Sequence, residues 1–195
     1  MSGYDDLVAE TPSWVWLEGH PALDFANTVI RRGWTELELI HSCADLESWL
    51  DAATLPAPRP RRVVQADVEA FLALRDPALR LLRAATGHGL WSAADAELVN
   101  EAIASVPVIE ALGATRGVIE TRTLGSPSPF ALLLARLAGE VRDALTSDVL
   151  ALCDAPGCGQ LFFRRRPNQA WCGPPCGTRA RVARHQQKRP RATDA

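Results

Sequence analysis

Four of the five cysteines in this 195-residue chain lie in one short stretch near its C-terminal end. They form two close pairs, C-x4-C and C-x3-C, with 13 residues between the pairs, and they are Cys153, Cys158, Cys172 and Cys176. Two close pairs separated by a hairpin-length insert suit a tetrahedral zinc ion, which takes four thiolates at about 2.3 Å. The spacing therefore predicts one zinc ion, with a disulfide pair or redox-active thiols as the alternative interpretations.

The same donor set indicates what kind of zinc site this is. Four protein ligands close the coordination sphere and leave no open position for a metal-activated water, which predicts a structural site. The sequence also lacks a nucleophile elbow, a phosphate-binding loop and metal-hydrolase spacing. We therefore expect no enzymatic activity, and Cys43, alone on a predicted helix, is expected to be a small buried side chain.

The segment around the cysteines is strongly basic. Residues 153–195 carry nine basic and two acidic side chains, whereas the preceding residues have a net charge of −9. Such asymmetry suggests that the basic end meets a polyanion. Prolines 174 and 175 favour the start of a helix, on which Arg181, Arg184 and Lys188 would form one cationic stripe. The predicted nucleic-acid contacts are Arg179, Arg181, Arg184 and Lys188, with Arg165 and Arg166 before the third cysteine.

Double-stranded DNA is the partner that this stripe favours. An arginine can bridge phosphates or read guanine in the major groove, and a helix fits in that groove. Phe162, Phe163 and Trp171 are better explained as the core of a small finger than as a platform for stacked single-stranded bases. A solvated face, RNA and an acidic protein partner remain the alternatives. Because one finger buries little surface, specific binding is expected to need a homodimer and two half-sites.

The elements that must position this module form a body dominated by helical signals. Helices are predicted from Pro21 through "PALDFANTVIRR", from Ser42, from Asp67, from Ser92 with an apolar face at Leu98, Val99 and Ala102, and from Ser128 with Pro129 at the first position. Two β-rich runs, 106–112 and 117–123, predict a β-hairpin. The fold class is thus α+β: a mainly α-helical body over 1–150 with a small β-hairpin, plus a treble-clef-like four-cysteine finger over 151–195.

A group of polar residues at the start of the body could bind a small-molecule effector. The candidate ligand pocket lies near Trp14 and Trp16 and comprises Glu18, His20, Asp24, Asn27 and Thr28. A helix cap or a buried hydrogen-bond network would explain the same residues. The body is therefore expected to sense a ligand or to dimerise.

The rest of the sequence indicates where the protein acts. The first ten residues, "MSGYDDLVAE", are acidic where a secretory signal would be basic and then apolar, and the apolar run "FALLLA" is far too short to span a membrane. We therefore expect a cytoplasmic protein with no membrane partner. Twenty arginines against one lysine are typical of a GC-rich bacterial genome.

Two motifs resemble known families. The segment "CDAPGCGQLFFRRRPNQAWCGPPCGTRARVARHQQKR" resembles the CGNR zinc finger through its four cysteines, Trp171, Gly177 and Arg179, and "LDFANT" at 23–28 resembles the associated ABATE domain. Thr178 stands where that family has asparagine, and the arginines of "FFRRRPNQAWC" lie earlier than in the family pattern. The resemblance implies a stress-linked transcription regulator.

The sequence as a whole predicts a bacterial zinc-finger regulator that binds DNA through its basic helix. One alternative is a protein-interaction module that uses the finger. The other is a small-molecule-binding protein or enzyme that acts through the N-terminal body.

Overall fold

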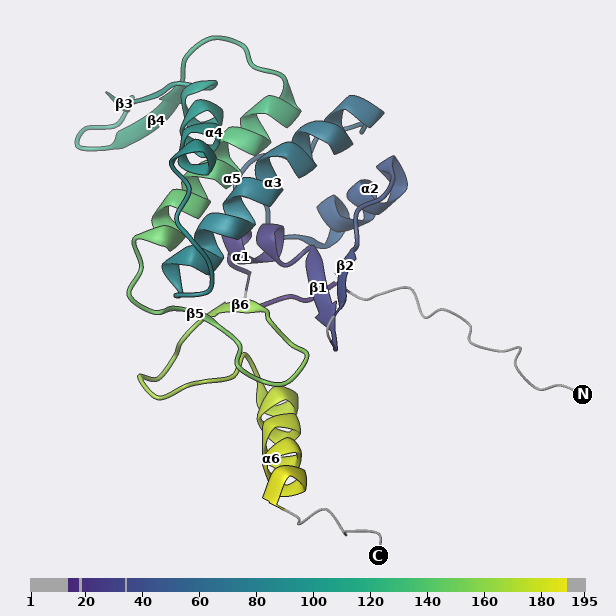
Figure 1. Cartoon of the computed structure of the whole chain (residues 1–195). Helices are drawn as coiled ribbons and strands as arrows, with labels where there is room; N and C mark the ends of the chain where they lie inside the picture. The colour runs from purple at the N-terminus through teal and green to yellow at the C-terminus, as the bar shows by residue number, and fades with distance from the viewer. Residues whose placement is uncertain (1–13, 18, 34, 189–195) are drawn as a thin grey trace, which may run out of the picture.

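A computed structural model describes residues 14–17, 19–33 and 35–188 (Figure 1). The elements are α1 (Pro21–Ala26), β1 (Val29–Arg32), β2 (Thr35–Glu38), α2 (Cys43–Ala52), α3 (Gln65–Ala85), α4 (Ala93–Ala104), β3 (Val108–Leu112), β4 (Ile119–Thr123), α5 (Pro129–Leu145), β5 (Leu150–Leu152), β6 (Leu161–Phe163) and α6 (Pro174–Lys188). The described strands pair antiparallel as β1–β2, β3–β4 and β5–β6. This confirms the α+β class. None of the described helices combines the length and the apolar character needed to cross a membrane.

The core of the body forms where α1, α2, α3 and α5 meet. Phe25, Trp49 and Phe71 are each at most 1% exposed, and their rings pack at centroid distances of 4.8 Å (Phe25–Phe71) and 5.1 Å (Trp49–Phe71). Leu133 and Leu137 of α5 are fully buried beside them. The aromatic rings and the leucines remove a large apolar area from water, so this cluster contributes strongly to the body's stability.

Local signals set the helix boundaries much as the sequence predicts. The hydroxyl oxygens of Ser42, Ser92 and Ser128 each accept the N–H three residues on, as N-caps do. α3 begins slightly before the predicted position: Asp67 lies in its first turn and its carboxylate accepts the N–H of Val64. The helix then continues through Pro77.

Two predictions about the body's helices need correction. The helix that starts at Pro21 ends at Ala26, and the chain turns into β1, so Ile30 reaches the core from a strand. No clear pattern in the sequence indicates the β1–β2 hairpin. In α4, Leu98 is 47% exposed, and only Val99 of the expected apolar face is deeply buried. An ion pair between Arg80 of α3 and Asp95 of α4 supplements that narrow apolar contact.

The β3–β4 hairpin confirms the predicted strand pair. Its register runs from Val108 opposite Thr123 to Leu112 opposite Ile119. The hairpin projects from the helical body at the end away from α6 (Figure 1).

β5 and β6 join the finger to the body with a short connection after α5. Leu150 and Leu161 belong to the main core of the body, whereas Phe162, on the opposite side of β6, belongs to a second small core around the cysteines. The alternation of side chains along one short strand therefore places the finger directly against the body.

Candidate metal centre and nucleic-acid interface

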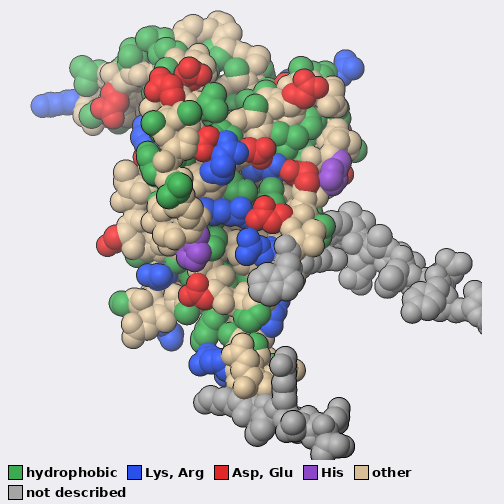
Figure 2. Space-filling view, in the orientation of Figure 1, with side chains coloured by type: hydrophobic (Ala, Val, Ile, Leu, Met, Phe, Trp, Pro, Cys, Tyr) green, Lys and Arg blue, Asp and Glu red, His purple; other side chains and the backbone are tan. Residues whose placement is uncertain are grey.

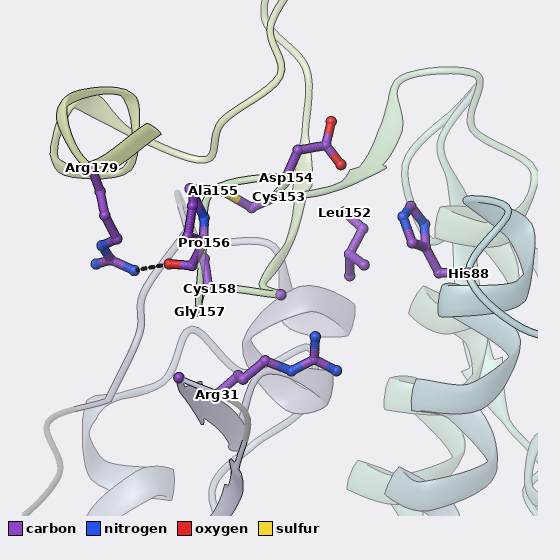
Figure 3. Close-up of a pocket in the computed structure, with 12 residues that line it drawn as sticks. Arg31, His88, Leu152, Cys153, Asp154, Ala155, Pro156, Gly157, Cys158 and Arg179 are labelled. Atoms are coloured by element: carbon purple, nitrogen blue, oxygen red, sulfur yellow. Dashed lines mark hydrogen bonds between the residues drawn. The ribbon is translucent and has the colours of Figure 1, made fainter. Parts of the chain in front are cut away.

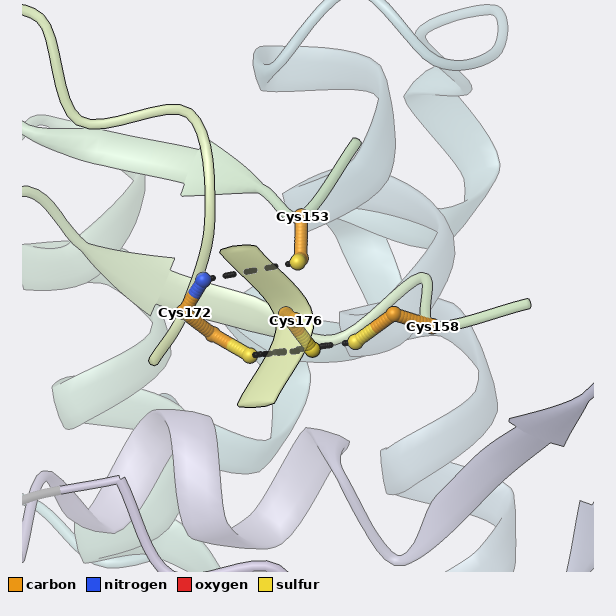
Figure 4. A group of neighbouring side chains, drawn as sticks. All are labelled: Cys153, Cys158, Cys172 and Cys176. Carbon is orange, nitrogen blue, oxygen red and sulfur yellow. Dashed lines mark hydrogen bonds between the residues drawn. The ribbon is translucent and has the colours of Figure 1, made fainter. Parts of the chain in front are cut away.

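The four predicted zinc ligands converge on one point (Figure 4). Their sulfur atoms all lie within 4.8 Å of one another. The Sγ–Sγ distance is 3.7 Å between Cys158 and Cys172 and 3.6 Å between Cys172 and Cys176. A tetrahedron with Zn–S bonds of about 2.3 Å requires sulfur separations of about 3.8 Å, so the donor set fits one zinc ion.

Local backbone structure puts each sulfur in place. Cys153 follows β5, and Cys158 ends a tight turn in which its N–H donates to the carbonyl of Ala155 at 3.0 Å. Gly157 in this turn has φ +70°, a left-handed conformation that favours glycine. Cys176 lies in the first turn of α6, which begins at Pro174 as predicted.

The charges of the thiols favour a bound cation. Contacts with the Cys158 and Cys172 side chains stabilise a thiolate at Cys153 and so lower its pKa. That neighbouring thiolate raises the pKa of both Cys158 and Cys172. Clustered thiols therefore cannot all ionise unless a cation offsets their repulsion. The four cysteines form the site of one structural zinc ion, which cross-links the turn after β5 to the start of α6.

The residues that flank the cysteines support this site. The Cys172 N–H donates to the Cys153 sulfur at 3.4 Å, an outer contact that orients a metal ligand. A Cβ on Gly177 would lie 3.3 Å from the ring of Trp171, so the indole packs closely on the backbone of α6. Arg179 donates to the Pro156 carbonyl at 3.1 Å and thereby ties α6 to the turn between the first two cysteines.

Asn27 connects the body to the finger. Its side-chain Nδ2 donates to the carbonyl of Leu161 at 2.9 Å, and its Oδ1 accepts the Leu161 N–H at 3.1 Å. The amide thus pairs with β6 as a neighbouring strand would. Asn27 is 3% exposed, so both bonds are shielded from water.

The other candidate pocket residues lie in different environments. Asp24 accepts the Leu17 N–H through Oδ1, its Oδ2 is buried without a hydrogen-bond partner, and burial raises the pKa of its carboxyl. Thr28 donates to the Phe25 carbonyl. His20 packs edge-on against Phe163 of β6, with ring centroids 4.5 Å apart. Glu18 lies outside the described residues. Ligand binding by this group stays a prediction.

The sequence pattern does not indicate the role of one buried arginine. Arg75 of α3 is 1% exposed, forms an ion pair with Glu38 of β2, and donates to the Thr28 hydroxyl at 2.8 Å. Its Nε also pairs with Asp76 at 2.7 Å. This network fixes the β1–β2 hairpin against α3. The only sequence signal was a basic residue within the apolar pattern of α3.

A cavity of about 710 Å³ lies between the finger and the body (Figure 3). Arg31 of β1, His88 after α3 and Arg179 of α6 contribute to its wall, together with the turn between Cys153 and Cys158. None of the described candidate pocket residues lines it. At one edge a Cβ on Gly157 would lie 3.0 Å from the Gly33 nitrogen, so the two turns touch.

α6, the helix of the predicted cationic stripe, extends away from the body (Figure 1). Arg181 and Arg184 are exposed, and the helix sequence contains no acidic residue. The Arg184 guanidinium lies over the Trp171 ring, 5.6 Å from its centroid, and Arg181 donates to the Thr178 hydroxyl. Lys188 is the last residue of the helix.

The other predicted nucleic-acid contacts lie elsewhere on the finger. At 100° per residue, Arg179 falls on the side of α6 opposite Arg181. Arg165 and Arg166 are exposed in the loop after β6. Lys and Arg side chains are visible over the finger in Figure 2, whereas Asp and Glu side chains lie mainly over the helical body.

Comparison with protein families confirms the two resemblances. Residues 19–148 match the ABATE model, described as "putative stress-induced transcription regulator", and residues 150–189 match the model of the CGNR zinc finger. A comparison with curated proteins gave no match. Both family descriptions concern regulation or zinc binding and name no catalytic activity.

Proposed function

Because the chain belongs to the ABATE family and carries a CGNR zinc finger, we propose that it is a DNA-binding regulator of transcription in the bacterial cytoplasm. It would act by binding and not by catalysis, since four cysteine ligands leave no open position on the zinc for an activated water. The finger would have treble-clef topology, with a turn, a strand pair and a helix around the ion.

The projecting cationic helix is the observation that carries this proposal. α6 is anchored by its first turns, where Cys176 and Ala180 are buried, and most of its described residues after Ala180 are exposed. An isolated basic helix of this width can enter the major groove of duplex DNA. Its positive charge would release counterions from the phosphates on binding.

The arginines of the finger would have different tasks in this complex. Arg181, Arg184 and Lys188 would contact phosphates or base edges from one side of α6. Arg165 and Arg166 would contact the flanking phosphates. Arg179, already bonded to the Pro156 carbonyl, would mainly hold the helix in position and add at most one contact.

We propose that the two parts of the chain, residues 1–150 and 151–195, have separate functions. The body would hold the finger and respond to a small-molecule effector near His20 and Asp24, where the partnerless Oδ2 of Asp24 offers an acceptor. A change there would reach the finger through Asn27 and Leu161. Two copies of the protein would supply two half-site contacts on DNA.

Binding of the zinc-loaded protein to a random duplex pool at several salt concentrations tests the proposal. The variant combines Arg181→Glu and Arg184→Glu, and its matched control combines Arg61→Glu and Arg62→Glu, two exposed positions on the body. Affinity should fall steeply with salt. Removing two phosphate contacts should lower the log–log salt slope by about 2, whereas the control should bind as the wild type does.

Two results would contradict DNA binding by α6. One is a wild-type protein that fails to bind duplex at low salt. The other is an equal loss of affinity in the α6 variant and in the body control, which would indicate a general charge effect. If the finger instead captures an acidic protein, binding to that protein but not to duplex DNA would depend on the same two arginines.

A further inference from the structure

Several large apolar side chains of the β3–β4 hairpin are exposed to solvent, which is unfavourable for an isolated strand pair. Leu112 and Ile119 are 79% and 67% exposed, and Val108, Ile109 and Val118 are each more than 40% exposed. Hydrophobic side chains are visible on this projecting hairpin in Figure 2. A two-stranded hairpin with both faces open is marginally stable by itself, so a partner would stabilise it.

The free edge of β4 has hydrogen-bonding groups available in a regular pattern. The N–H of Gly113 donates to the Val118 carbonyl, and the N–H of Leu124 donates to the Pro107 carbonyl. These two bonds establish which residues of β4 form hydrogen-bonded pairs with β3. Because such pairs alternate along an antiparallel ladder, the backbone N–H and C=O groups of residues 118, 120 and 122 point toward β3. The N–H and C=O groups of Ile119, Thr121 and Thr123 therefore point away from the hairpin, where another strand can pair with them.

The charges along β4 complement those of a second, antiparallel β4. The register that pairs all five residues of β4 with a second copy has Thr121 opposite the partner's Thr121. Glu120 then lies opposite the partner's Arg122, and Arg122 lies opposite the partner's Glu120. These positions form non-hydrogen-bonded pairs, in which side chains on neighbouring strands are closest. Two ion pairs would thus form across the two-fold axis.

The same register aligns the exposed apolar side chains. Leu112 and Ile119 are cross-strand neighbours within the hairpin. A second copy would extend their row with the partner's Thr123 and Val108. The row would run across four strands, in place of the two exposed residues of each separate hairpin.

The free edge of β3 does not show this complementarity. Glu110 is the one charged residue of β3 and lies at its centre. The register that pairs all five residues of β3 with a second copy would place Glu110 opposite the partner's Glu110, which is unfavourable. The charge pattern therefore distinguishes the two edges and selects β4.

We propose that two copies of this chain pair through the free edges of their β4 strands, antiparallel and centred on Thr121, to form a four-stranded sheet. The proposal deepens the two-half-site part of the proposed function, but it stands on the hairpin alone. Because it is tested on the free protein, its failure would leave DNA binding by α6 untouched.

Sedimentation equilibrium of the full, zinc-loaded chain without DNA tests the pairing. The wild type should form a dimer. Glu120→Arg places like charges opposite each other at two symmetric positions, so it should raise the dimer dissociation constant by about tenfold or more. The swap of Glu120→Arg with Arg122→Glu restores both opposite-charge pairs and should recover the wild-type constant. Glu110→Arg, with the same charge change on β3, serves as the control and should not weaken the dimer.

A proline pair tests the edge independently of charge. Thr121→Pro removes an N–H that points to the proposed partner and takes no part in the hairpin ladder, so the dimer should be lost while the monomer stays folded by circular dichroism. Glu110→Pro makes the equivalent change on the β3 edge and should leave the dimer intact. A monomeric wild type would overturn the proposal. So would a dimer insensitive to Thr121→Pro, or a charge swap that does not recover dimerisation.

Discussion

Different forces stabilise the helical body and the zinc finger. The body has an aromatic core at Phe25, Trp49 and Phe71, which is buried by four helices. The finger has a small core of its own, in which three of the six buried residues are zinc ligands. A core of that size rarely folds alone. Zinc binding and contact with the body must therefore supply the rest of the finger's folding free energy.

Each region also contributes to the core of the other. Leu150 and Leu161 of the finger's strands lie in the main core, and Leu17, from the chain before α1, packs on the small core of the finger. The dependence is unequal, because the body keeps most of its core without these residues. The body should therefore survive the loss of the finger, but the finger should not survive the loss of the body.

Zinc removal should have the largest effect. Structural zinc sites contribute on the order of 10 kcal/mol at neutral pH, so chelation should unfold the finger and α6. The buried rings of the body should stay packed, since none of them belongs to the small core around the cysteines. Circular dichroism should show partial loss of helix, and near-ultraviolet dichroism should retain the signal of Trp49. Complete loss of the Trp49 signal would mean that the two regions fold as one unit.

Trp49→Ala tests whether the finger depends on the folded body. Deleting a fully buried indole should lower the free energy of unfolding by about 3–5 kcal/mol, as measured by urea denaturation. Because the finger depends on the body, the apparent zinc affinity should also fall. Trp91→Ala, at a 57% exposed position, is the matched control and should change neither quantity by much. An unchanged zinc affinity in Trp49→Ala would show that the finger folds independently.

Asn27→Ala examines the contact between the regions. The change leaves the N–H and C=O of Leu161 buried without partners, at about 1–3 kcal/mol for each group. We expect faster zinc release to a chelator and a lower midpoint of thermal unfolding. Asn100→Ala, exposed on α4, should show neither effect. Wild-type zinc release in Asn27→Ala would refute the role of the amide as a strand partner.

Asp24→Asn should have the smallest effect, and its sign depends on pH. Burial raises the pKa of the Asp24 carboxyl in the folded protein, so its contribution to stability is fully present below the unfolded-state pKa and is lost as the pH rises through the folded-state pKa. Asparagine keeps an acceptor for the Leu17 N–H without the buried charge. The variant should be more stable than the wild type at neutral pH and should lose this advantage in acid. Thermal unfolding at several pH values measures it; a destabilised variant at neutral pH would contradict the argument.

Features set by neighbouring residues could be predicted from the sequence. The serine caps, Pro129 and the two cysteine pairs act within a few residues of themselves, so their consequences are visible in the local pattern. The paired β-rich runs near 106–123 belong to the same group, since a short turn joins them. The zinc site was therefore accessible without a structure.

Contacts between residues far apart in the sequence could not be predicted from local patterns. Asn27 and Leu161 are 134 positions apart, and nothing near either residue indicates the other. Arg75 pairs with Glu38 from a different element, and the β1–β2 hairpin depends on that pair. The polar residues between Glu18 and Thr28 therefore resemble one candidate pocket in the sequence, although the described members face different neighbours.

The Asn27 amide also sets where this protein can be cut and recombined. A boundary at residue 150 looks natural along the chain, yet a finger moved to another protein would leave behind the side chain that completes its strand. A working chimera would need either α1 together with the finger or an asparagine of the new host placed beside β6. The smallest portable unit is therefore discontinuous in sequence, and it joins the start of the body to the zinc ligands.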